Sequence, residues 1–198
     1  AAFFKKMKIS GAENNGETWE SAGLADMTMT CTAFDWEQPA PAEVRVSVTL
    51  SMQGKNGCGF TFKTTYTVLG DGRVICDNRF TPHGPLPVLP RLGAMLTLPA
   101  AYKQVRWLGF GPWETYPDRD ACGQFGAFTE TCGDTLAYYA KPQECGSKEQ
   151  CRYISLTDEA GDGLLVFGEV PYACSALPFT PQELSGMQHL NDTLRRDK

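Results

Sequence analysis

Residues 43–53 read E-V-R-V-S-V-T-L-S-M-Q, with an apolar side chain at every second position. The same alternation precedes this stretch in residues 27–33 and follows it in residues 58–68. Because successive side chains of a strand point to opposite faces of a sheet, the pattern predicts antiparallel strands with one buried and one wet face. Gly70-Asp71-Gly72 predicts a turn that needs positive φ, after which the chain returns as a strand. We therefore expect residues 43–80 to form a β-meander.

The second half of the chain predicts shorter strands and a single helix. Four prolines between residues 82 and 90 interrupt the strand pattern, because proline cannot donate to a ladder. A capping box at Thr180-Pro181-Gln182-Glu183, followed by apolar Leu184, Met187 and Leu190, predicts one short C-terminal helix. No βαβ alternation is present, so we expect an all-β fold. Further strands are expected at residues 92–98, 105–108, 136–140, 151–156 and 164–170, with a long loop over residues 109–134.

Composition excludes several classes of function. With 198 residues, 42% of them hydrophobic, the chain is long enough for one large all-β domain over residues 1–198. A net charge of −5 argues against a nucleic-acid partner, and no apolar run approaches the roughly 18 residues that span a membrane. The eight cysteines form no Cys-x-x-Cys pair and only two histidines accompany them, so we expect no metal site. Cys31, Cys58 and Cys76 are expected to be buried free thiols because they are in phase with apolar neighbours.

The densest cluster of unusual residues is the run W-L-G-F-G-P-W-E-T-Y-P-D-R at residues 107–119. Glu114, Asp118 and Arg119 are close enough in sequence to form a charge-assisted network that fixes the loop, which is a structural role first. Trp107 is expected in the core, and Trp113 in an exposed turn. Spacing nominates no catalytic pair among the loop acids, which are Glu114, Asp118, Asp120, Glu144, Asp158, Glu159 and Asp162.

Five motifs occur in an order that resembles the C-terminal β-sandwich domain of family 2 glycoside hydrolases of the β-galactosidase type. The longest is G-x-G-P-x-E-x-Y-P-D-R at residues 109–119. Elsewhere in the chain Cys145 and Lys148 depart from the family pattern, standing where that family commonly has asparagine and arginine. The other motifs are W-x-x-A-G-L at 19–24, P-R-L-G at 90–93, P-Q-E-x-G at 142–146 with Arg152, and the segment 179–184 with His189 and Asp192.

The resemblance implies a galactose mutarotase-like antiparallel supersandwich, in which two sheets pack face to face. It implies a non-catalytic domain of a retaining β-galactosidase that supports the active-site mouth and assembly, with the catalytic glutamates in a barrel outside this chain. No catalytic residue is therefore assigned here. Trp113, Glu114 and Arg119 are candidate substrate-binding residues, and Trp113 could stack on the apolar face of galactose. Expected partners are the remaining domains, a β-galactoside and a second copy in a homo-oligomer. A divalent cation such as Mg²⁺ would belong to the parent enzyme, with no cofactor in this chain.

The family's R-A-P-x-D-N-D and G-G-D-x-S-W segments are expected before Ala1 and after Lys198, so the chain is interpreted as a fragment truncated at both ends. Two alternatives stay open. One is a stand-alone mutarotase-like epimerase, which would need His83 or His189 beside a carboxylate. The other is a carbohydrate-binding module without chemistry. The compartment, cytoplasmic or periplasmic, is not determined by the sequence.

Overall fold

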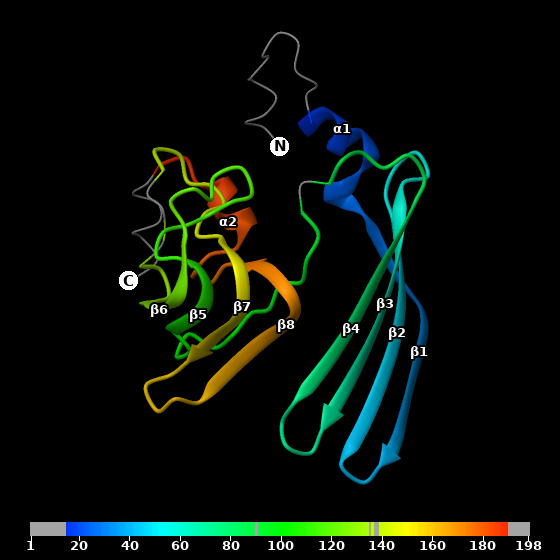
Figure 1. Ribbon diagram of the computed structural model, residues 1–198. Helices are drawn as coiled ribbons and strands as arrows, with labels where there is room; N and C mark the ends of the chain where they lie inside the picture. Colours follow the sequence, from blue (N-terminus) through cyan, green and yellow to red (C-terminus); the bar gives the residue numbers. More distant parts are fainter. Residues whose placement is uncertain (1–14, 90, 135, 137–138, 190–198) are drawn as a thin grey trace. The chain divides into compact units, whose positions relative to one another are not determined.

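The computed structural model describes residues 15–89, 91–134, 136 and 139–189, and its strands form two four-stranded antiparallel sheets (Figure 1). The prediction of an all-β fold is confirmed. The chain divides into two compact units, residues 1–94 and residues 95–198, and each sheet belongs to one of them. The single domain over residues 1–198 and the face-to-face packing of the sheets stay predictions.

The first sheet is a meander of β1 (Thr28–Ala40), β2 (Glu43–Gln53), β3 (Gly59–Leu69) and β4 (Val74–His83), in that order. This confirms the expected meander over residues 43–80. The turn between β3 and β4 contains Gly72 at φ 89°, a conformation that glycine adopts without a Cβ clash. The side chain of Arg73 binds Asp71 at 2.8 Å across the same turn.

Register places the apolar side chains of this sheet on one face. Val46 pairs with Tyr66, which in turn pairs with Cys76, so all three project to the same side. Much of that face is open: Trp36 is 62% exposed. Cys31 and Cys76 are therefore exposed, and the prediction that they are buried was wrong, because the face they share with their apolar neighbours is not covered within the unit. Cys58 is buried as expected.

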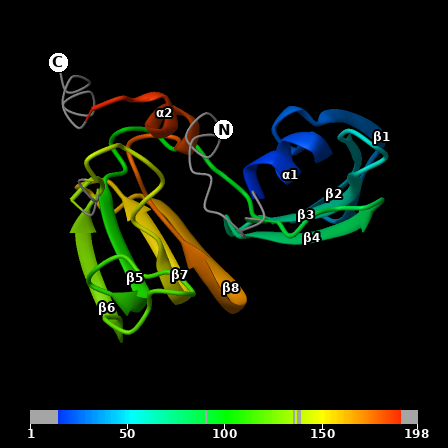
Figure 2. The same cartoon turned by 90° about the horizontal axis from the view of Figure 1, so that it is seen from above.

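The first sheet also carries a helix, α1 (Asn15–Ala22), followed by a 3₁₀ turn, η2 (Leu24–Asp26). Figure 2 shows α1 beside this sheet. The end of α1 is tied to the β2–β3 turn, where the N–H of Lys55 donates to the carbonyl of Ala22 at 2.8 Å and the amide of Asn56 donates to that of Ser21 at 3.1 Å. The sequence did not predict α1, because its residues N-G-E-T-W-E-S-A show no apolar stripe.

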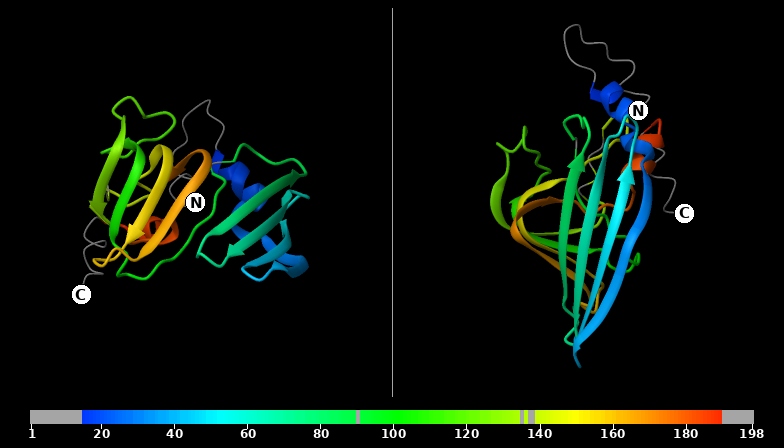
Figure 3. Two further views of the ribbon diagram at one scale, coloured as in Figure 1. Left: turned by 60° about the horizontal axis from the view of Figure 1, so that its bottom comes forward. Right: turned by 90° about the vertical axis from the view of Figure 1, so that its right-hand side faces the viewer.

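The second sheet has the order β6-β5-β7-β8, with β5 (Gln104–Gly111) between β6 (Gln124–Thr131) and β7 (Lys148–Thr157), and β8 (Gly163–Cys174) at one edge (Figure 3). The strands expected at 105–108, 151–156 and 164–170 are confirmed. The prediction of a long loop over residues 109–134 was wrong. β6 lies inside it and pairs with β5, with the ring of Phe128 stacked on Trp107 at 5.3 Å.

Two hydrophobic clusters stabilise this unit. Val105, Trp107, Cys151 and Ile154 form the buried centre of the sheet cluster. Leu184 of α2 (Pro181–Gly186) forms the second cluster with Leu136 and Cys145. The predicted capping box is present, because Thr180 accepts from the N–H of Glu183 at 3.2 Å and Glu183 accepts from the N–H of Thr180 at 2.8 Å. No helix in the described part of the chain is long and apolar enough to span a membrane.

Two of the shorter predicted strands are absent. Residues 92–98 form no ladder, and the strand pattern in this stretch finds no partner among the described strands. Leu136, Tyr139 and Ala140 are not in a strand, while residues 137 and 138 of that predicted strand lie outside the described residues. Pro90, Tyr138, Leu190 and Asp192, which entered the sequence argument, lie outside them too.

We predict that Thr180→Ala lowers the free energy of unfolding by about 1 kcal/mol, because the N–H of Glu183 then loses its acceptor. Thr180→Ser keeps the hydroxyl and should stay close to wild type. Urea unfolding of the three proteins measures the difference. Equal stability of the alanine and serine variants would show that the capping box does not support α2.

Candidate functional site

The run at residues 107–119 begins in β5 and ends in a tight loop. Trp107 is buried, and its indole N–H donates to the carbonyl of Phe110 at 2.9 Å, so its ring is fixed under the end of the strand. Beyond Gly111 the chain leaves the sheet. The loop closes in a turn where the N–H of Arg119 donates to the carbonyl of Tyr116 at 2.8 Å. The arginine side chain lies over the ring of Tyr116, at 4.9 Å from its centroid.

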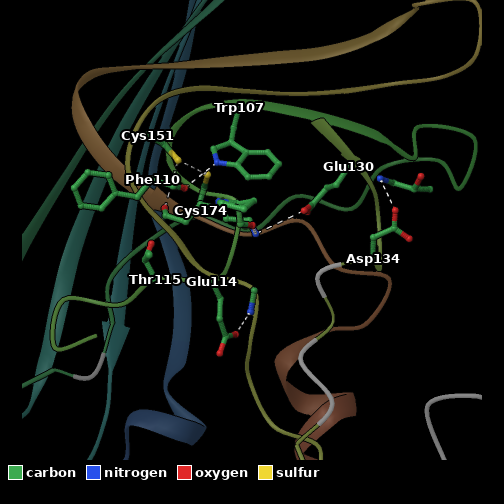
Figure 4. Close-up of polar contacts among 12 residues, drawn as sticks. Trp107, Phe110, Glu114, Thr115, Glu130, Asp134, Cys151 and Cys174 are labelled. Carbon is green, nitrogen blue, oxygen red and sulfur yellow. Dashed lines mark hydrogen bonds and ion pairs between the residues drawn. The ribbon is translucent and has the colours of Figure 1, made fainter. Parts of the chain in front are cut away.

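Glu114 is the acceptor at the centre of this loop (Figure 4). Its side chain is 14% exposed, and it accepts from the N–H of Gly146 at 2.7 Å and from Arg119 at 2.8 Å. The hydroxyl of Tyr139 also donates to Glu114 and accepts from Arg119 at 3.0 Å. Burial, together with the hydrogen bond to Glu114, raises the pKa of Tyr139, so the phenol stays a donor at neutral pH.

The predicted charge-assisted network is therefore present, but it includes other residues than predicted. Glu114 and Arg119 form it, and their further partners are Tyr139 and Gly146. Within the described part of the chain, Asp118 adds no hydrogen bond or ion pair to this network. Both oxygens of Glu114 are engaged within the loop. The arrangement is a clamp that holds residues 112–119 against residues 139–146, the structural role that the sequence predicted.

Thr115 fastens the loop to the beginning of β7. Its side chain is fully buried, its N–H donates to the carbonyl of Ser147 at 2.8 Å, and its hydroxyl accepts from the N–H of Glu149 at 2.9 Å. The next residue, Tyr116, has a buried hydroxyl that finds no hydrogen bond of ordinary geometry within the described residues. Burial, with the negative charge of Glu114 nearby, raises the pKa of the Tyr116 phenol well above its usual range.

Lys148 is a buried cation beneath the loop. Its ammonium donates to the carbonyl of Pro112 at 3.2 Å, lies 3.6 Å from the carboxylate of Glu130, and lies 4.6 Å from the centroid of the Trp107 ring. Burial lowers its pKa, an effect that the charge of Glu130 opposes. The sequence marked Lys148 only as a departure from the family pattern and did not predict its burial.

Trp113 is the member of the run that faces solvent, with 71% of its surface exposed. Glu114 and Arg119 of the same loop bind each other at 2.8 Å. Of the three candidate substrate-binding residues, Trp113 has a free ring face, whereas the other two already bind one another. Tyr139, one of the aromatic residues near this loop, is half-buried through its contacts with Glu114 and Arg119.

Asp158, His83 and His189 lie in other elements than this loop. Asp158 caps the β7–β8 turn by accepting from the N–H groups of Ala160 and Asp162 at 2.9 and 3.0 Å. His83 ends β4 and His189 follows α2, so they belong to different units. An open groove of about 460 Å³ lies beside the same β7–β8 turn, lined by Arg106, Tyr153, Phe167 and neighbouring residues, with no carboxylate.

The described residues do not fit a divalent cation such as Mg²⁺. Hard cations take several oxygen ligands, mostly from carboxylates. In the described part of the chain, no three His, Cys, Asp or Glu residues come together in a way that could hold a metal ion. No chemistry of this loop is therefore derived through a metal.

Comparison of the chain with known proteins identifies the family whose members it resembles. The family model described as "Beta galactosidase small chain" matches residues 8–198. A β-galactosidase of Priestia megaterium is 30% identical over 173 residues, which are 87% of this chain and 16% of that protein. A β-galactosidase of Vibrio vulnificus is 29% identical over 182 residues, 91% of this chain and 17% of that protein. The β-galactosidase BgaC of Bifidobacterium adolescentis is 37% identical over 113 residues, 56% of this chain and 11% of that protein. The chain thus spans about a sixth of the length of the first two relatives.

We predict that Lys148→Met lowers the free energy of unfolding by roughly 3 kcal/mol, because the buried carboxylate of Glu130 loses its cation. The double variant Lys148→Met with Glu130→Met should recover most of that loss, since well-packed apolar side chains can replace a buried ion pair. Urea unfolding of the wild type, both single variants and the double variant gives the coupling. Additive losses in the double variant would contradict the ion pair.

We predict that stability falls more steeply above pH 10 in the wild type than in Tyr116→Phe. The folded chain holds the phenol proton at a pH where the unfolded chain, with a pKa of roughly 10, releases it. Ionisation therefore favours the unfolded state as pH rises through this range. At pH 7 the two proteins should differ by no more than about 1 kcal/mol. Denaturant midpoints measured from pH 7 to 11 test this, and parallel curves would contradict it.

Proposed function

The chain belongs to the β-galactosidase small-chain family, and on that premise we propose that it is the non-catalytic C-terminal domain of a retaining β-galactosidase of glycoside hydrolase family 2. One observation carries the proposal: two full-length β-galactosidases match nearly all of this chain with only a sixth of their own length. The parent enzyme would hydrolyse terminal β-D-galactosides. Its remaining domains would be the partners of this chain, and copies of the parent would associate into a homo-oligomer.

Retaining hydrolysis needs two carboxyl groups about 5 Å apart, one as nucleophile and one as acid and base. Glu114 is poorly suited to either role, because Gly146, Arg119 and Tyr139 already donate to it. The proposal therefore places both catalytic carboxylates in the domains outside this chain. A divalent cation such as Mg²⁺ in the parent would likewise take its ligands from those domains.

The contribution of this domain would come through Trp113. An indole ring offers a large apolar face at little entropic cost, and the loop beneath it is held by the Glu114–Arg119 pair and by Lys148. A rigid, exposed ring of this kind suits either the apolar face of a galactoside or a neighbouring domain at the active-site mouth. Support for the proposal comes from its 71% exposure on a loop in which Glu114 is already bound by Arg119 and Gly146.

The same exposure favours a second candidate function, a carbohydrate-binding module without chemistry. In that case the isolated chain itself would bind galactose. A saturable change in tryptophan fluorescence on titration with galactose, abolished by Trp113→Ala, would support this candidate. If tryptophan fluorescence does not change with galactose, the supporting role of Trp113 within the parent enzyme is favoured instead.

We predict that Trp113→Ala in the whole enzyme raises KM for a β-galactoside by roughly tenfold, or weakens assembly, while most of kcat is kept. The physical reason is that the ring binds the substrate or a neighbouring domain without touching the bond that breaks. Steady-state kinetics and the sedimentation of the enzyme measure the two effects.

A matched control is Trp36→Ala, which removes another exposed indole, 62% exposed, from β1 and should leave KM near the wild-type value. Loss of most of kcat with the fold intact would contradict the proposed role of Trp113. A native protein of 21.7 kDa that acts alone, detected in its source by an antibody to this chain, would contradict the parent enzyme itself.

A further inference from the structure

Two cysteines of the second sheet face each other across neighbouring strands. The sulfur of Cys174, at the end of β8, lies 3.3 Å from the sulfur of Cys151 in β7 (Figure 4). Cys151 is fully buried and Cys174 is half-buried. Both are free thiols, as are Cys31, Cys58 and Cys76, for which the sequence predicted free thiols. Neither residue takes part in the contacts of the Glu114 loop.

Strand register explains why the two sulfurs meet. Lys148 pairs with Cys174 and Cys151 pairs with Tyr172, so β7 uses one residue more than β8 over the same interval. The extra residue forms a bulge, and Gln150 within it adopts φ 58°. Cys151 and Cys174 are thereby diagonal neighbours across the bulge, within the range where side chains on adjacent strands touch.

The surroundings keep the sulfur of Cys151 in place. Trp107, Val105 and Ile154 pack around it. Gly109 of β5 leaves room for it, since a Cβ at that position would come within 2.7 Å of the Cys151 sulfur. The Cys151 thiol donates to the carbonyl of Lys148 at 3.4 Å. A disulfide has an S–S bond of about 2.05 Å, so the sulfurs need to approach each other by only about 1.2 Å.

We propose that Cys151 and Cys174 form a redox modification site, which a hydroperoxide converts to a disulfide and a thiol reductant restores. The proposal is independent of the proposed function, since it rests on the contacts of the second sheet alone. The oxidant is a small peroxide, which reaches the two sulfurs from the side of the half-buried Cys174.

The chemistry takes two balanced steps. The sulfur of Cys151 attacks one oxygen of hydrogen peroxide, so that an S–O bond forms, the O–O bond breaks, and the thiol proton leaves with the displaced oxygen as water. The sulfur of Cys174 then attacks the sulfur of the Cys151 sulfenic acid. An S–S bond forms, the S–O bond breaks, and the Cys174 thiol proton leaves with the displaced hydroxyl as a second water. The Cys174 thiol that donates to Cys151 lowers the pKa of Cys151, which favours it as the first nucleophile.

A disulfide here would fasten the beginning of β7 to the end of β8. Residues 146–149, at that end of β7, supply the Gly146 N–H to Glu114, the backbone partners of Thr115 and the ammonium of Lys148. Oxidation would therefore stiffen the support of the Glu114 loop without adding any group to it.

The full chain, treated with hydrogen peroxide and then alkylated, tests the proposal by peptide mapping without reduction. We expect a cross-linked pair of peptides joining Cys151 to Cys174, which disappears on treatment with dithiothreitol. The melting temperature of the oxidised chain should rise by roughly 5 to 10 °C and return on reduction.

Cys174→Ser should lose both the cross-link and the rise in melting temperature, while Cys122→Ser, which removes an exposed thiol of the loop, should keep both. The mapping of the wild type needs no variant, so it decides the question even where a serine variant folds poorly. A wild-type chain that keeps Cys151 and Cys174 as thiols while Cys122 is oxidised would overturn the proposal. A disulfide between either residue and another cysteine would overturn it as well.

Discussion

The second unit is organised around one buried charge that must find its partners inside the protein. Burying an ammonium costs several kcal/mol unless other groups replace its water. Lys148 meets this requirement with the carbonyl of Pro112, the carboxylate of Glu130 and the ring of Trp107. These partners come from the loop after β5, from β6 and from the centre of β5, while the lysine itself begins β7. A single cation thus fixes how three strands and one loop come together.

The clamp at Glu114 extends that arrangement outward. A carboxylate that accepts from a backbone N–H, a guanidinium and a phenol is stabilised by charge-assisted hydrogen bonds, and it has little capacity left for a substrate. The loop therefore exposes Trp113, while the charged side chains of Glu114 and Arg119 bind each other and hold the loop in shape.

The first sheet is subject to the opposite constraint, because its apolar face has little to pack against within its own unit. Alternation aligns Val46, Tyr66 and Cys76 on one face, as the sequence predicts. The same pattern predicted that the side chains on this face are buried, and this prediction was wrong for Cys31 and Cys76. Period-two alternation tells which face of a strand is apolar, but whether that face is covered depends on a second layer that the strand's own sequence does not encode.

Local patterns determined the strands of the meander, the turn at Gly72 and the capping box at Thr180, because each depends on neighbours a few residues away. The ordered motifs likewise indicated the family, and the spacing of Glu114 and Arg119 indicated their ion pair. Only the tertiary structure decided that residues 124–131 form β6, that residues 92–98 form no strand, and that Lys148 is buried. Each of these depends on a partner strand or a counter-charge that is distant in the sequence. The contact between Cys151 and Cys174 likewise depends on a bulge between two strands. Pairing and desolvation are set by what the folded chain places alongside a residue, which no pattern within a single segment contains.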